Sequence, residues 1–159
     1  MAEIQRLRDD HAEALLAFEV TNREFFARTI PDRGDDYFTD FSRRHTALLA
    51  EQSTGTCQFH VLVDEDGAVL GRFNLFDVAE GSAELGYRVA EHATGRGLAK
   101  LGVRRVIDLA RHDYGLTRLT AGAGRDNTAS LAVLRATGFV AVGPSERGGI
   151  RHVRDLGAP

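Results

Sequence analysis

The sequence predicts an α/β (α+β) fold in which helices flank one central, mixed and mostly antiparallel sheet. The first observation behind this prediction is a change in hydrophobic period, from helical spacing before residue 54 to strict alternation after it. The second is a helical stretch between two strand candidates, 83–90 and 116–124, because a helical crossover joins parallel strands of one sheet. We expect about six to seven strands, about four helices and a single domain over residues 1–159.

Strands are predicted where apolar and polar residues alternate between turn residues. In the segment CQFHVLV, apolar residues from Cys57 to Val63 alternate with Gln58 and His60, which is typical of a half-buried strand. The turn residues DEDG follow and favour a hairpin with the next strand. By the same criteria we expect strands at residues 2–8, 57–63, 68–78, 83–90, 116–124, 139–143 and 150–156.

Helices are predicted where apolar residues recur three and four positions apart. The clearest one starts near residue 97, since Val103, Val106, Ala110 and Tyr114 fall on one face and Gly115 is a suitable left-handed cap. The other helices are expected at residues 9–28, 35–53 and 126–137.

Composition and charge exclude several classes of protein. The net charge of −3 argues against non-specific nucleic-acid binding as the main role. No apolar run approaches the roughly 18–20 residues of a membrane span, and the N-terminus has no apolar signal core. A single cysteine, Cys57, fits a reducing compartment, so we expect a cytoplasmic protein. The six histidines show no ligand spacing, and we expect no metal.

Two glycines, Gly95 and Gly97, stand at the start of the long helix in ATGRGLAKLGVRRV, although glycine is costly inside regular elements. No Walker A string occurs, and a dinucleotide fingerprint would need glycine where Lys100 stands. A helix N-terminus also binds anions, because its amides lack partners and its dipole is positive there. The pair therefore forms either a simple turn or a pyrophosphate site.

The neighbouring segments resemble the GNAT acetyl-CoA-dependent N-acetyltransferases. Residues 94–99, TGRGLA, align with the family motif [Q/R]-x-x-G-x-[G/A], with Thr94 at the Gln/Arg position. A second family motif matches at Asn127, Ser130, Gly138 and Phe139. The resemblance covers nearly the whole chain, and its first half is similar to the branch of ribosomal-protein N-terminal (alanine) acetyltransferases.

This resemblance implies a GNAT-like fold in which the strands flanking the long helix splay apart where that helix begins. It further implies that acetyl-CoA binds there as co-substrate, with the pantetheine arm along one strand and the pyrophosphate on the helix start. Thr94 lacks the side-chain phosphate contact of Gln or Arg, and Asn127 is also a good N-cap without any cofactor. The implied cofactor-binding residues are Arg88, Val89, Ala90, Thr94, Gly95, Arg96, Gly97, Leu98, Ala99, Asn127 and Ser130.

An N-acetyltransferase needs a base for its amine and a proton source for the departing thiolate. Glu84 is the candidate base, although a strand carboxylate is also commonly paired with an arginine. The tyrosine that many family members use as donor is replaced by Leu134, so the resemblance leaves Ser130 as candidate donor. Tyr87 and His60 remain alternatives for that role.

The acceptor implied by the resemblance is a primary amine, either a protein N-terminus such as that of a ribosomal protein or a small molecule. Exposed acids at Asp35, Asp36 and Asp40 could attract a cationic amine. We expect a monomer or homodimer, without nucleic-acid or membrane partners. A non-catalytic acyl-CoA-binding sensor on the same fold is the alternative. Residues of the first two helices that could contact the acceptor are Asn22, Arg23, Phe25, Phe26 and Tyr37.

Overall fold

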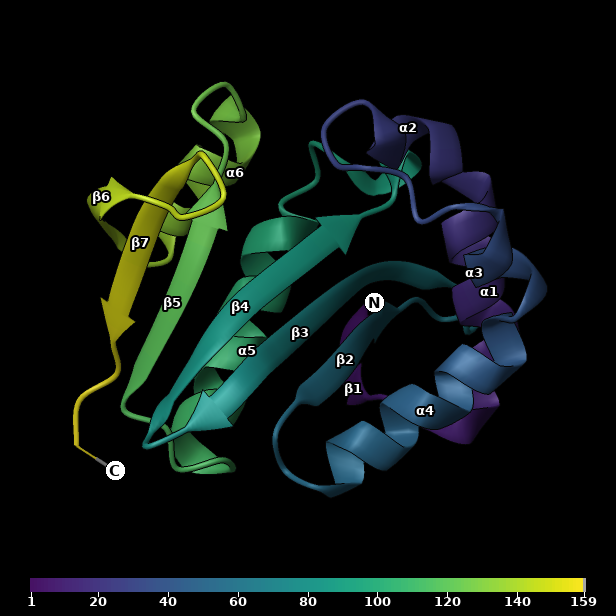
Figure 1. Cartoon of the computed structure of the whole chain (residues 1–159), viewed down its shortest axis with the longest axis horizontal. Helices are drawn as coiled ribbons and strands as arrows, with labels where there is room; N and C mark the ends of the chain where they lie inside the picture. Colours follow the sequence, from purple (N-terminus) through teal and green to yellow (C-terminus); the bar gives the residue numbers. More distant parts are fainter. Residues whose placement is uncertain (159) are drawn as a thin grey trace.

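The computed structural model describes residues 1–158 and contains one seven-stranded sheet (Figure 1). The strand order is β1-β2-β3-β4-β5-β7-β6, and every neighbouring pair except β4–β5 is antiparallel. The mostly antiparallel sheet with one parallel pair is therefore confirmed. The strands are β1 (Glu3–Arg6), β2 (Gln58–Val63), β3 (Val69–Ala79), β4 (Ser82–Val89), β5 (Arg118–Ala123), β6 (Val140–Pro144) and β7 (Ile150–Asp155).

The described residues contain six α-helices and two short 3-10 turns, more helices than the four expected. The predicted helix at 9–28 ends at Asn22 and restarts, and the one at 35–53 is interrupted at Asp40. The long helix ends at His112, so Tyr114 lies beyond it. The helices are α1 (Ala12–Thr21), α2 (Arg23–Ala27), α3 (Asp35–Thr39), α4 (Phe41–Ser53), α5 (Leu98–His112) and α6 (Thr128–Ala136), with 3-10 turns at Asp9–His11 and Glu91–Ala93.

Helices α5 and α1 cover opposite faces of the sheet. Phe73 of β3 lies so close to α5 that a Cβ on Gly102 would come within 2.2 Å of its ring. The preceding residue, Arg72, contacts Glu19 of α1. Because successive residues of a strand point to opposite faces, these two contacts define an α5 face and an α1 face. Figure 1 accordingly shows α5 behind β3 and β4.

Strands β4 and β5 separate at their carboxyl ends. Their pairing runs from Ser82 with Arg118 to Leu85 with Ala121 and then stops, although β4 continues to Val89. Figure 1 shows the two strands diverging beyond that point, where the chain turns into α5. Residues 86 to 89 therefore pair with β3 on one edge only.

A continuous apolar core fills both sides of the sheet. Its fully buried members include Phe59, Phe73 and Leu75 from the central strands, and Val103 and Val106 from α5. The apolar face predicted for the long helix is thus confirmed. Within residues 1–158, none of the helices combines the length and apolarity that crossing a bilayer requires.

Candidate active site

The open edge of β4 presents backbone groups of alternating residues. The Ala90 amide donates to the Leu70 carbonyl at 2.8 Å, which directs Ala90 and, by alternation, Arg88 toward β3. The N–H and C=O groups of Val89 and Tyr87 therefore point to the open side. Ala90 also accepts from the Ala93 amide at 3.0 Å, so its N–H and its C=O both already have a partner within the chain.

The loop after β4 presents a series of free amides at the start of α5. The amides of residues 95 to 100 have no hydrogen-bond acceptor within residues 1–158, as expected for the first turn of a helix. Gly95 and Gly97 have φ values of +75° and +74°, and a Cβ on either would meet nothing within 4 Å. The two glycines thus permit a left-handed turn, and that turn leaves the amides uncovered. The side chains of Arg96 and Lys100 are exposed beside them.

Thr94 is turned away from this series of amides. Its hydroxyl donates to the Glu91 carbonyl at 2.7 Å, and its own amide donates to the same carbonyl at 3.2 Å. The residue at the family's Gln/Arg position therefore closes the Glu91–Ala93 turn, and both of its donors are already engaged.

Across the open edge, α6 brings Ser130 to Tyr87. The Ser130 hydroxyl and the Tyr87 phenol share a hydrogen bond of 2.9 Å, and the Tyr87 ring stacks on Phe73 with centroids 5.8 Å apart. Asn127 caps α6, since its side-chain oxygen accepts from the Ser130 amide at 3.1 Å. Burial raises the pKa of Tyr87, although the bond to Ser130 opposes the rise, so the phenol stays protonated at neutral pH.

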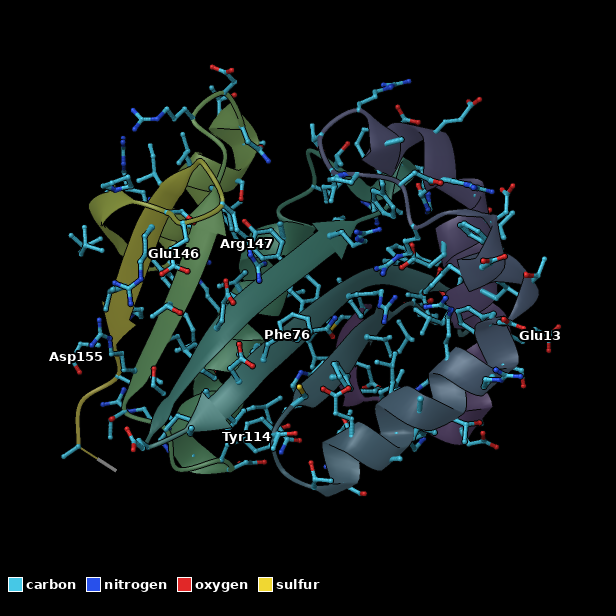
Figure 2. All side chains as sticks on the ribbon, in the orientation of Figure 1. Glu13, Phe76, Tyr114, Glu146, Arg147 and Asp155 are labelled. Atoms are coloured by element: carbon cyan, nitrogen blue, oxygen red, sulfur yellow. The ribbon has the colours of Figure 1, made fainter. Side chains whose placement is uncertain are left out.

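Glu84 lies on the other face of β4. It stands opposite Phe76 of β3 and Thr120 of β5, and directly opposite residues in a sheet share a face. Figure 2 shows Phe76 on the face turned toward the viewer, away from α5. The carboxylate is half-buried and forms no ion pair with any residue in the range 1–158. The candidate base and the Ser130–Tyr87 pair therefore flank the open edge from opposite sides.

His60, the other alternative proton donor, has a structural role. One ring nitrogen bonds the Phe73 carbonyl at 2.8 Å and the other bonds the Tyr114 hydroxyl at 2.6 Å. Burial lowers the pKa of His60 to about 4, so the ring is neutral at physiological pH. Across residues 1–158, no three His, Cys, Asp or Glu side chains gather as metal ligands would.

The sequence matches a model of the Acetyltransferase (GNAT) domain over residues 3–140. The chain belongs to the GNAT acetyltransferase family. This membership makes it an acetyl-CoA-dependent acyltransferase, as predicted from the glycine motif and its neighbours. The chain is 29% identical over 142 residues to the probable N-acetyltransferase YjcK of Bacillus subtilis, a match covering 86% of this chain and 78% of YjcK.

Solved GNAT structures have the same fold. The ribosomal-protein-S5-alanine acetyltransferase from Vibrio fischeri superposes with a TM-score of 0.91 at 19% identity, covering 98% of this chain and 93% of that one. RimJ from Mycobacterium smegmatis, solved in complex with CoA-disulfide, superposes with a TM-score of 0.86 at 23% identity, covering 97% of this chain and 81% of RimJ. At these identities the likeness shows the fold alone.

The residues of α1 to α3 that were predicted to contact the acceptor, here called the acceptor wall, are only partly accessible to it. Asp35 is exposed and accepts from Arg23 at 2.9 Å, and Arg23 also binds Asp32, so these three side chains together carry one negative charge. Asn22 is buried and links α1 to the glycine loop, accepting from the Glu91 amide at 2.9 Å. Phe26 and Tyr37 are buried in the core.

Sequence reasoning missed the most heavily charged feature of this wall. Glu19, 1% exposed, accepts hydrogen bonds from three arginines of distant segments. Its distances are 2.7 Å to Arg72, 3.2 Å to Arg33 and 3.2 Å to Arg88. The only signal in the sequence was a glutamate on the apolar side of a predicted helix.

Proposed function

We propose that this enzyme transfers the acetyl group of acetyl-CoA to a primary amine by direct attack in a ternary complex. The acceptor is a protein N-terminal α-amine, such as that of a ribosomal protein, or a small-molecule amine. The observation that carries the proposal is the unpaired edge of β4 leading into a loop of uncovered amides. A ligand with an extended arm and a diphosphate at its end fits this arrangement, because the arm can pair with the strand edge and the diphosphate can bind the amides.

The acetyl donor would use both parts of this site. The amides of the pantetheine arm would pair with the outward backbone groups of Val89 and Tyr87, as an added strand does. The pyrophosphate would bind the amides of residues 95 to 100, with the helix dipole and the exposed Arg96 adding attraction. Asn127 and Ser130 would lie beside the arm, since α6 reaches the same open edge.

The reaction needs a proton removed on one side of the thioester and supplied on the other. Glu84 would accept a proton from the amine, directly or through water, as nitrogen attacks the carbonyl carbon. The tetrahedral intermediate then breaks its carbon–sulfur bond and the thiolate leaves. The Ser130–Tyr87 pair would donate a hydrogen bond or a proton to that sulfur, because its phenol stays protonated at neutral pH.

Acetylation is tested by following free thiol during turnover with a panel of peptide and small-molecule amines. For Glu84→Gln we expect kcat/KM at pH 7 to fall by about 100-fold, within the range for loss of a general base. The difference in kcat/KM between wild type and Glu84→Gln should become smaller as the pH approaches the pKa of the acceptor amine, because a deprotonated amine needs no base. Glu13→Gln, at an exposed glutamate of α1, is the matched control.

Two outcomes would contradict parts of this proposal. Unchanged turnover of Glu84→Gln at every pH would remove Glu84 from the role of base. Tight acetyl-CoA binding without thiol release on any amine would instead favour a non-catalytic acyl-CoA sensor.

A further inference from the structure

The α1 face carries a buried charge cluster that is not electrically balanced. We call Glu19, Arg33, Arg72 and Arg88 the Glu19 cluster; its single carboxylate meets three guanidinium groups at 2.7 to 3.2 Å. Arg72 also donates to the Tyr37 hydroxyl at 3.1 Å, but that partner is neutral. The cluster therefore holds an excess of two positive charges.

Two neighbouring acids share the single guanidinium of Arg23 and so contribute one net negative charge, which offsets only half of this excess. Asp32 and Asp35 are both bound to Arg23, at 2.8 and 2.9 Å, and Asp35 lies in solvent. Burial and the like charges of Arg33 and Arg72 lower the pKa of Arg88 by more than the carboxylate of Glu19 raises it, so the positive charge of Arg88 is only partly compensated. A buried charge without a partner is unfavourable, so the cluster favours an added anion.

The two outer arginines keep an approach open. The side chain of Arg72 is 6% exposed, whereas those of Arg88 and Arg33 are 16% and 31% exposed. Arg88 uses a single nitrogen for Glu19 among residues 1–158, leaving its other donors available. The cavity that touches Glu19, Arg33 and Arg88 measures only about 10 Å³, room for about one water, so an anion must bind on the open side.

This open side is also the side of the candidate base. Glu84 and Arg88 point to the same face of β4, with their Cα atoms about 13 Å apart. Gly86 stands between them without a side chain, and the Phe76 ring packs against it. An amine near Glu84 would therefore share a face of β4 with the partly compensated cation of Arg88, four residues further along the strand.

We infer that the acceptor amine carries a carboxylate close to its nitrogen, and that Arg88 and Arg33 bind that carboxylate. The inference rests on the proposed function and specifies its acceptor. A guanidinium group suits a carboxylate because two of its N–H groups can form parallel N–H···O bonds with the two oxygens. The carboxylate is either the α-carboxylate of a free amino acid or an acidic side chain beside a protein N-terminus. A polyamine carries only positive charge and is disfavoured.

Matched acceptors test the inference directly. L-Phenylalanine is compared with its amide, and a peptide beginning Ala-Asp with one beginning Ala-Asn, using thiol release as readout. We expect kcat/KM to be at least about tenfold higher for the carboxylate member of one pair, and that pair identifies the source of the carboxylate. Equal rates within both pairs, or spermidine exceeding all four, would overturn the inference.

The Arg33→Gln variant distinguishes binding from a structural role. We expect its preference for the carboxylate member to fall below about threefold through a higher KM, with acetyl-CoA affinity unchanged. Arg104→Gln, at an exposed arginine of α5, should keep the wild-type preference. A lower melting temperature of Arg33→Gln with the preference intact would show that the cluster only holds the fold.

A binding measurement separates this inference from the proposed function. The N-acetylated form of the preferred carboxylate acceptor and its neutral amide counterpart are titrated calorimetrically into the protein without acetyl-CoA. Tighter binding of the anion by wild type than by Arg33→Gln supports the carboxylate site even if no acetyl transfer occurs. If the enzyme transfers acetyl groups but wild type and Arg33→Gln bind the anion equally well, the proposed function is supported and the carboxylate site is contradicted.

Discussion

Glycines within one short segment serve two different physical purposes. Gly95 and Gly97 adopt positive φ in open surroundings, so their conformation requires glycine and no neighbour crowds them. Gly102, one turn into α5, has ordinary helical geometry, but a Cβ there would lie 2.2 Å from the Phe73 ring. The first two glycines shape the loop that is proposed to bind acetyl-CoA, and the third lets α5 approach β3.

The Gly102→Ala substitution should therefore destabilise the protein despite alanine's better helix propensity. The added methyl group collides with the ring of a fully buried phenylalanine, and overpacking of this kind costs about 1–3 kcal/mol. Urea unfolding followed by circular dichroism measures the loss. Arg104→Ala, at an exposed site of the same helix, is the control. An unchanged midpoint for Gly102→Ala would mean that α5 is not held against Phe73 as described.

At the scale of elements, local patterns predicted nearly every strand and the apolar face of α5, because these depend on neighbouring residues. The first two helices were predicted too long, and the break after α1 involves a distant contact. The Asn22 side chain donates to the Phe18 carbonyl and accepts from the Glu91 amide, a residue 69 positions away. No pattern within α1 reveals that second contact.

The candidate site was predictable to a similar degree. The glycine loop was predicted from its motif, and the position of Glu84 from the alternation of its strand. Ser130 and Tyr87 were each named as candidate donors, but the hydrogen bond between them was not predicted. The Glu19 cluster was not predictable, because its partners lie up to 69 residues away and only the folded sheet places Arg72 opposite Arg88.

His60 and Tyr114 join β2 to the chain after α5 and make stability depend on pH. Burial lowers the folded-state pKa of His60 from 6.5 to about 4, so the unfolded chain takes up its proton first as the pH falls. The stabilisation is complete above pH 6.5 and is lost toward pH 4, by about 3 kcal/mol.

This pH dependence is measured as the urea unfolding free energy at pH 7 and pH 4. In His60→Gln the unfolding free energy should fall by about 3 kcal/mol less between pH 7 and pH 4 than in wild type, because glutamine does not titrate. His112→Gln replaces an exposed histidine and serves as control. The same fall in wild type and His60→Gln would contradict a buried neutral imidazole.

At the scale of the whole molecule, the sheet separates the chemistry into two faces and one edge. The α5 face supplies the hydroxyl pair and the α1 face supplies Glu84 and the Glu19 cluster. The turn between β6 and β7 closes the α1 face from the other side, since Ser145 lies 3.6 Å from a Cβ position on Gly122. Figure 2 shows Glu146 and Arg147 of that turn in front of the sheet, as Phe76 is. In the proposed reaction the donor and the acceptor would therefore approach β4 separately and meet at its open edge.

The most direct test of this arrangement is calorimetric titration of acetyl-CoA into wild type, Gly97→Asn and Gly97→Glu. Asparagine tolerates a left-handed conformation, so Gly97→Asn reports on strain and bulk, whereas glutamate adds a negative charge at the free amides. We predict micromolar binding by wild type, a modest loss for Gly97→Asn and a loss of more than about 100-fold for folded Gly97→Glu. Equal binding by wild type and Gly97→Glu, or none by folded wild type, would contradict a pyrophosphate site at the start of α5.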